Sequence, residues 1–234
     1  MGGLGLVWDG IARALGLVAS GDPDMLAITR LSLLVSGTAT ALSLAVGVPL
    51  GTLLALSRFP GRGVLVALVN TGMGLPPVVV GLLVSILLWR QGPLGAWELL
   101  YTPTAMILAQ SVIAAPVVTG LTLAAVQAVP PRFRLQMQAL GASRPQLLLV
   151  LLRQARLPLL AACMAGFGAV ISEVGASLMV GGNIRGQTRV LTTATVLETG
   201  KGNFDVAIAL SVILLALTFL VNWALTWIQQ QQRP

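Results

Sequence analysis

The polar side chains that could bind a small ligand are concentrated in residues 183–193, which lie between two long apolar segments. They comprise one asparagine, two arginines and three threonines: Asn183, Arg185, Thr188, Arg189, Thr192 and Thr193. Amide, guanidinium and hydroxyl groups donate hydrogen bonds, and a small anion needs such donors and positive charge when it leaves water. The stretch is therefore a candidate anion site. The alternative stays open that its arginines pair with Glu198, with Asp205, with lipid phosphates or with a partner protein.

A single carboxylate, that of Glu173, interrupts the otherwise uncharged residues 157–184. An ionised group in such an apolar segment is costly unless it has a function or a buried partner. Because a carboxylate repels anions, we do not expect Glu173 to bind one directly. We expect it to hold a gate by accepting hydrogen bonds from Ser172, or from threonine or arginine side chains of a neighbouring helix. A packing role is the alternative.

Pro76 and Pro77 interrupt another apolar segment, residues 63–89. Proline has no backbone N–H and breaks a regular helix, so nearby carbonyl groups are left free. In a bilayer, irregular backbone is tolerated only inside the protein or beside a water-filled cavity. The two prolines are therefore candidates for lining a pathway, and a purely structural kink is the equal alternative.

The rest of the composition excludes several kinds of chemistry. The chain has one cysteine, Cys163, and no histidine, which excludes a disulfide framework, a Cys/His metal site and a histidine-based catalytic triad. Gly200, Lys201 and Gly202 resemble the end of a phosphate-binding loop, but no Ser or Thr follows the lysine. We therefore expect no catalytic residues, no metal and no cofactor bound by this chain, and we expect Cys163 to be a packing residue.

The distribution of charge determines the elements that must position these residues. Charged residues make up 9% of the chain and apolar residues 56%, whereas soluble domains contain roughly 25% charged residues, so a soluble helical bundle is disfavoured. The charges leave five long gaps, each longer than the ~20 residues that a helix needs to cross a bilayer. The sequence predicts an all-α integral membrane protein with transmembrane helices at about residues 31–57, 63–89, 102–128, 157–182 and 206–228.

These spans form one predicted transmembrane domain, residues 30–230, after an N-terminal segment, residues 1–29. Asp9 and Arg13 interrupt the apolar residues 4–18, which does not fit a cleaved signal, and we expect a short interfacial helix there. Gly47 and Gly51, four residues apart, predict a close helix contact, either within one chain or between two copies.

The basic residues indicate the orientation in the membrane. The net charge is +7, but the basic residues lie between apolar segments rather than on one aromatic-rich face, so we expect no nucleic-acid partner. The positive-inside rule assigns Arg58, Arg62, residues 132–156 and Arg233 to the cytoplasm. The N-terminus and residues 90–98 and 185–205 are then extracytoplasmic. The C-terminus is cytoplasmic, and we expect the chain to lie in a bacterial inner membrane.

The cytoplasmic residues 132–156 are the longest and most basic of these connections. Gly141, Ala142 and Ser143 give a tight break, and Pro145 suits the first turn of a second helix. The segment therefore predicts two short helices joined by a turn. Such a segment is either a rigid knob that a soluble partner can hold in a groove, or an ordinary interfacial hairpin.

Residues 132–156 resemble the coupling loop of ABC importer permeases. Leu-Gly-Ala-Ser at 140–143 matches the second half of the family pattern, whereas Leu135, Gln136 and Met137 stand where Glu-Ala-Ala is usual. The pair Leu157 and Pro158 follows four residues later than is usual.

Other stretches resemble the same family. APVVTGL (115–121) precedes the coupling loop at the expected distance, and GLPPVVVGLL (74–83) is similar to the broken helix of molybdate and tungstate permeases. The run EVGASLMVGGNIRGQTRVLTTATVLETGKGNF (173–204) is similar nearly residue for residue to tungstate permeases, and its GNI-x-G-x-T core is shared with molybdate permeases.

The resemblance implies a type I ABC importer permease for an oxyanion, with tungstate as the expected cargo and molybdate as the alternative. It implies a homodimer, two ATPase subunits that bind ATP and magnesium, and an extracytoplasmic binding protein that delivers the anion. The expected ATPase contacts are seven residues of the coupling loop: Gln136, Met137, Ala139, Leu140, Gly141, Ala142 and Ser143. The rival classes are an ion-coupled secondary transporter with Glu173 as its ion site, an oligomeric channel and a membrane scaffold.

Overall fold

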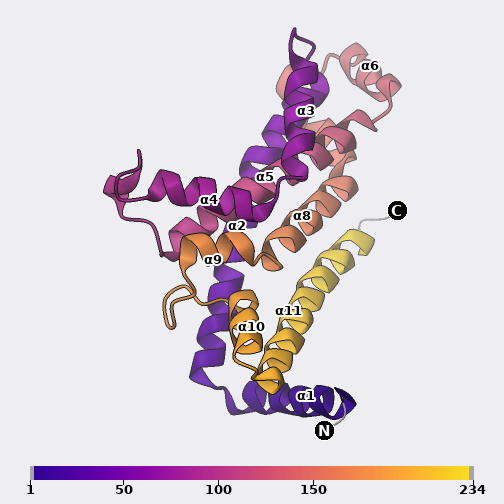
Figure 1. The fold of residues 1–234 in the computed structure, drawn as a ribbon. Helices are drawn as coiled ribbons and strands as arrows, with labels where there is room; N and C mark the ends of the chain where they lie inside the picture. The colour runs from indigo at the N-terminus through magenta and orange to yellow at the C-terminus, as the bar shows by residue number, and fades with distance from the viewer. Residues whose placement is uncertain (1–2, 232–234) are drawn as a thin grey trace.

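The computed structural model describes residues 3–231, and the regular structure in that range is entirely helical (Figure 1). The elements in chain order are α1 (Gly3–Ser20), α2 (Pro23–Leu56), α3 (Arg62–Met73), α4 (Pro77–Leu88), the 3-10 helix η1 (Gly95–Trp97), α5 (Pro103–Gln127), α6 (Pro131–Ala139), α7 (Arg144–Gln154), α8 (Arg156–Ile171), α9 (Gly175–Gly181), α10 (Leu191–Gly200) and α11 (Phe204–Gln231). The predicted all-α fold is confirmed. Arg233, which was assigned to the cytoplasm, lies outside the described residues.

Among the described residues, three helices are each long and apolar enough to cross a membrane: α2, α5 and α11. The number rises to five if each of two bent pairs is one span: α3 with α4, bent by 103°, and α7 with α8, bent by 69°. The second predicted span is therefore two helices that meet near Pro76. The fourth predicted span, residues 157–182, instead covers α8, a break and the short α9, and α7 lies before it in the predicted coupling segment. The position of each helix in a membrane stays a prediction.

The long helices α2 and α5 each begin with a side-chain cap and a proline. The Asp22 side chain accepts a hydrogen bond from the Met25 N–H at 2.8 Å, and Pro23 is the first residue of α2. Thr102 accepts one from the Ala105 N–H at 3.4 Å, and a proline again begins the helix α5. A side-chain cap accepts a hydrogen bond from an unpaired N–H in the first turn, and a proline there has no N–H to leave unpaired.

Small residues allow α2 and α5 to pack closely. A Cβ atom on Gly51 would lie 2.5 Å from the carbonyl oxygen of Thr119, and one on Gly47 would lie 2.8 Å from Cγ1 of Val118. No larger residue fits there without moving one helix, and backbones approach this closely only where side chains are small. The close contact predicted at these glycines is thus made within the chain.

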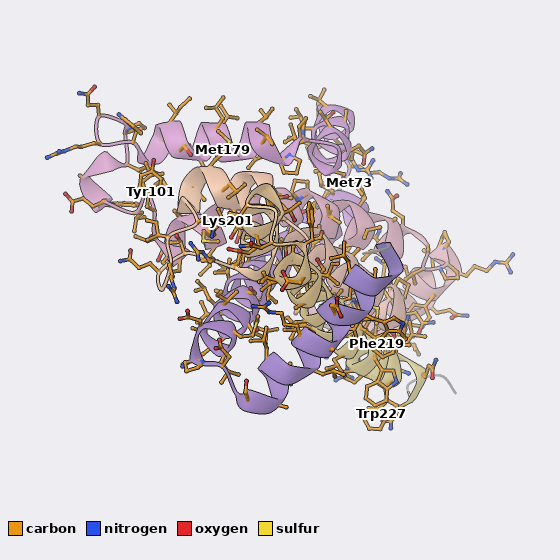
Figure 2. All side chains as sticks on the ribbon, turned by 60° about the horizontal axis from the view of Figure 1, so that its bottom comes forward. Met73, Tyr101, Met179, Lys201, Phe219 and Trp227 are labelled. Carbon is orange, nitrogen blue, oxygen red and sulfur yellow. The ribbon has the colours of Figure 1, made fainter. Side chains whose placement is uncertain are left out.

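The helix α1 lies across one end of the molecule, beside the start of α11, whereas α6 lies at the opposite end (Figure 1). An ion pair joins Arg13 of α1 to Asp205 of α11. The helix predicted for residues 4–18 is present as α1. Its interfacial position stays a prediction. On α11, Phe219 and Trp227 are both exposed, and Trp227 stands at the edge of the molecule (Figure 2), as suits a face in contact with lipid.

Candidate functional site

The turn after α9 is held in one conformation by its own polar groups. Asn183 has a positive φ of 53° there. Its Oδ1 atom accepts hydrogen bonds from Thr193 Oγ1 at 3.0 Å and from Arg189 Nε at 3.3 Å, and its Nδ2 atom donates to the Thr193 carbonyl at 3.3 Å. Three of the six residues predicted for an anion site therefore form one network.

The threonine hydroxyls of this stretch are used inside the protein. Thr188 is fully buried, and its hydroxyl donates to the Gly181 carbonyl at 2.5 Å and accepts from the Ile184 N–H at 2.9 Å. Thr192 Oγ1 donates to the Glu173 carbonyl at 2.9 Å. A hydroxyl has only one hydrogen to donate. In this conformation these threonines hold the shape of the stretch rather than offer free donors to an anion.

The two arginines of the stretch differ in their partners. Arg185 is exposed and forms an ion pair with Asp24 at the start of α2, and this hydrogen-bonded carboxylate raises the pKa of the Arg185 guanidinium. Arg189, which contacts the Asn183 side chain, also donates from Nη2 to the Asn183 carbonyl at 3.4 Å. Arg189 therefore belongs to the turn, whereas Arg185 joins the turn to α2.

The carboxylates that were alternative partners for these arginines bind other groups. Glu198 accepts from Asn203 Nδ2 at 2.8 Å and from Lys201 Nζ at 2.7 Å, and these hydrogen bonds lower the pKa of its carboxyl group. Asp205 pairs with Arg13. Arg185 pairs with Asp24 instead, and among the described residues no salt bridge joins either loop arginine to Glu198 or Asp205. The charge of Arg189 acts on Glu198 without a salt bridge and helps to lower the pKa of that carboxyl group.

Glu173 occupies the break between α8 and α9 and is 6% exposed. Its Oε1 atom accepts a hydrogen bond from the Ala176 N–H at 2.8 Å, in the first turn of α9. The prediction that Ser172 donates to the Glu173 carboxylate is wrong, because the Ser172 hydroxyl donates to the Gly168 carbonyl of the preceding helix α8 at 2.8 Å. The threonine expected on a neighbouring helix is Thr192, but it bonds the main-chain carbonyl of Glu173 rather than the carboxylate. Glu173 thus caps α9 and connects it to α10.

The break at Glu173 lies against the break at the two prolines. Pro76 is extended, with φ of −62° and ψ of 123°, and Pro77 is the first residue of α4. A Cβ atom on Gly175, at the start of α9, would lie 2.7 Å from Cγ2 of Val78 in the first turn of α4. The structure therefore places Pro76, Pro77 and Glu173 on neighbouring irregular segments.

A buried polar pair on α5 and α9 was missed by the sequence reasoning. Gln110 Nε2 donates to Ser177 Oγ at 3.0 Å, and both residues are buried. Within the described part of the chain, the Oε1 atom of Gln110 has no hydrogen-bond partner. A glutamine inside the apolar residues 102–128 was the available signal, since a buried amide in a membrane helix usually bonds a neighbouring helix.

The predicted coupling segment, residues 132–156, has the conformation that its sequence indicated. It consists of α6, a turn and α7, and Gly141 in the turn has φ of +79°. The Ser143 N–H donates to Gln146 Oε1 at 2.8 Å, which completes the start of α7. Of the seven expected ATPase contacts, Met137 and Ala142 are half-buried and the other five are exposed, Leu140 at 78%.

Broken apolar helices joined by buried polar contacts, together with an exposed helical turn at one end, define a membrane transport protein that a soluble partner can contact. The chain belongs to the family of inner membrane components of binding-protein-dependent transport systems, which it matches over residues 47–234. It is therefore the permease component of an ABC transporter, and the ATPase is a separate component.

Several relatives match nearly the whole chain, two of them at 38% identity or more. A probable anion ABC transporter permease protein of Haloferax volcanii is 46% identical over 88% of this chain and 92% of its own length. The tungstate uptake system permease protein TupB of Peptoclostridium acidaminophilum is 38% identical over 95% of this chain and 98% of its own length.

The fold is similar to that of a solved transporter. The structure of the MetNI methionine ABC transporter in inward-facing conformations matches with a TM-score of 0.75 and 22% identity, over 91% of this chain and 99% of that chain. The likeness confirms the fold of an ABC importer permease, and at this identity it shows nothing of the cargo.

Proposed function

We propose that this chain is the translocating subunit of an ATP-driven importer for a tetrahedral oxyanion, and that tungstate is its cargo. One observation supports this most strongly. The run 173–204, which resembles tungstate permeases, folds as one unit held by internal hydrogen bonds. Thr192 donates to the Glu173 carbonyl, and Thr193 donates to the Asn183 side chain. Similarity to a tungstate permease over 95% of the chain supports the same cargo.

The proposed assembly contains two copies of this chain, two ATPase subunits and an extracytoplasmic binding protein. The ATPases bind ATP and magnesium, and they contact the exposed turn around Gly141. The binding protein delivers the anion to the opposite face, near residues 183–193. In this assembly the chain lies in a bacterial or archaeal cell membrane with its N-terminus outside.

One helix connects the two proposed working parts. The 16 residues of α8 begin directly after the coupling segment and end at the break beside Glu173. At ~1.5 Å per residue, a helix of this length spans about 24 Å. A rigid helix that is pushed at one end moves the other, so displacement of α7 by an ATPase would reach the junction of α8, α9 and α4.

In this proposal the buried contacts form a gate and do not coordinate the anion. Glu173 holds the start of α9 in place, and Pro76 and Pro77 provide an irregular backbone segment beside it. Arg189 contributes positive charge at the mouth without leaving the Asn183 network. The cargo is then selected mainly by the binding protein, and the permease supplies a passage that accepts a small dianion.

The selectivity test uses the complete complex in lipid vesicles, with its ATPase and binding protein. ATP hydrolysis is measured as the binding protein is loaded with tungstate, molybdate or sulfate. We expect tungstate to stimulate hydrolysis at the lowest concentration. Stimulation first by molybdate would support the runner-up cargo, which has the same charge and nearly the same size. If neither tungstate nor molybdate stimulates ATP hydrolysis, both are excluded as the cargo.

A further inference from the structure

A pocket of about 300 Å³ lies between the start of α2 and the turn that follows α9. Its charged lining comprises three arginines and one carboxylate: Arg30, Arg185, Arg189 and Asp24. Its apolar lining comes entirely from α2: Ala27, Ile28, Leu31 and Leu34. The pocket therefore has a cationic end and an apolar wall.

The positive charge of this pocket is only partly balanced. Asp24 neutralises Arg185 through their ion pair, and Arg189 bonds the neutral Asn183. Within the residues that the structure describes, the Arg30 guanidinium makes no ion pair or hydrogen bond. The Arg30 guanidinium, together with the N–H groups of Arg189 that do not bond Asn183, thus remains available to an anionic ligand.

The position of the pocket along α2 restricts the kind of ligand. Arg30 is the last charged residue before the apolar residues 31–57. Leu34 lies one turn further along the helix and is 47% exposed. The apolar wall therefore continues along the outer surface of a helix that is long and apolar enough to cross a membrane. A ligand that matches both ends has an anionic head and a hydrocarbon tail.

We propose that this pocket binds the phosphate group of an anionic phospholipid, with the acyl chains lying along Leu31 and Leu34. Guanidinium groups bind phosphate oxygens in a bidentate geometry, and Arg30 and Arg189 supply that group from two different elements. A free oxyanion shares the chemistry of the phosphate but leaves the apolar wall uncovered. The proposal does not depend on which cargo the transporter carries.

Native mass spectrometry of the full-length chain in detergent tests the proposal, with phosphatidylglycerol and phosphatidylcholine as probes. The Arg30→Gln variant removes the unpaired charge and leaves the Asp24–Arg185 pair in place. Arg90→Gln is the matched control, because it makes the same change of charge at another exposed arginine. A basic residue near a lipid surface contributes on the order of 1 kcal/mol, so we expect Arg30→Gln to weaken phosphatidylglycerol binding about fivefold.

The expected result is that wild-type protein and Arg90→Gln bind phosphatidylglycerol equally, more tightly than phosphatidylcholine, and that free tungstate does not displace the lipid. Equal binding of the two lipids by wild-type protein would overturn the proposal without any variant. Equal losses of phosphatidylglycerol binding in Arg30→Gln and Arg90→Gln would also overturn the proposal. Displacement of phosphatidylglycerol by tungstate would assign the pocket to free oxyanions instead.

Discussion

Glu173 stabilises the start of α9 by accepting a hydrogen bond, and no ion pair involves its carboxylate within the described residues. Glu173→Ala leaves the buried Ala176 N–H without a partner, which costs about 1–3 kcal/mol. Glu173→Gln keeps an acceptor oxygen at the same place. We therefore expect Ala to lower the melting temperature and abolish uptake, and Gln to retain most of both.

The same pair of variants tests the rival class at this residue. A secondary transporter that used Glu173 to carry an ion would need the charge, so Gln and Ala would inactivate it alike. Thermal unfolding in detergent and uptake in vesicles, measured side by side, separate loss of the cap from loss of the charge. A stable but inactive Glu173→Gln protein would contradict the capping role.

Thr193 tests whether the turn after α9 is held by its own bonds. Thr193→Val keeps the shape of the side chain but removes the hydrogen bonds to Asn183 Oδ1 and from the Val190 N–H. We expect a loss of about 1–3 kcal/mol, because a buried backbone N–H is left unpaired. Thr199→Val, on the exposed face of α10, is the control and should cost less than about 0.5 kcal/mol. Equal stability of Thr193→Val and Thr199→Val in denaturant would contradict the claim that the Thr193 hydrogen bonds hold the turn.

Among the helices, the contact of α2 with α5 depends on the glycines between them. Gly51→Ala places a methyl group against the Thr119 carbonyl, and we expect it to destabilise the protein by about 1–3 kcal/mol. Gly37 lies in the same helix with nothing within 4 Å of its Cβ position. Gly37→Ala should instead stabilise the helix, by up to about 1 kcal/mol. Matching effects of the two changes on thermal unfolding would show that the contact is not tight.

The turn between α6 and α7 is the element through which the ATPase is proposed to act. Gly141→Asp adds a charged side chain at φ of +79°, in open space. We expect a folded protein whose binding-protein-stimulated ATP hydrolysis falls at least about tenfold, since a docked contact is worth about 1.4 kcal/mol or more. Gly61→Asp is the matched control, because Gly61 also has a positive φ, of +86°, and open space at its Cβ position. Retained stimulation in Gly141→Asp would remove this turn from the energy route.

The elements that the sequence predicted correctly are those governed by the exclusion of charge from apolar segments. The helix α5 lies within an uncharged run, α2 carries no charge from Leu31 onward and α11 none from Val206 onward. The Gly-Ala-Ser break separates α6 from α7. The helix α10 was missed, because its polar residues were assigned to a loop. The sharp bend between α3 and α4 follows from Pro76 and Pro77, but its angle depends on the packing of α9.

The site was predicted in composition and not in its bonds. Asn183, Arg189 and Thr193 are close in sequence, and the structure brings them together. The partner of Arg185 could not be found, because Asp24 is 161 residues away and only the folded chain places α2 beside the turn. The role of Glu173 is local and could have been predicted, since an acidic side chain three residues before a helical N–H is a common cap.

For the whole molecule, the central claim is that ATP hydrolysis by a partner moves an oxyanion through this chain. Its most direct test is uptake of labelled tungstate into vesicles that contain the complete complex, with ATP inside and loaded binding protein outside. The account predicts uptake that requires both ATP and the binding protein and that continues when an uncoupler abolishes ion gradients. Uptake that persists without ATP and stops with the uncoupler would contradict it.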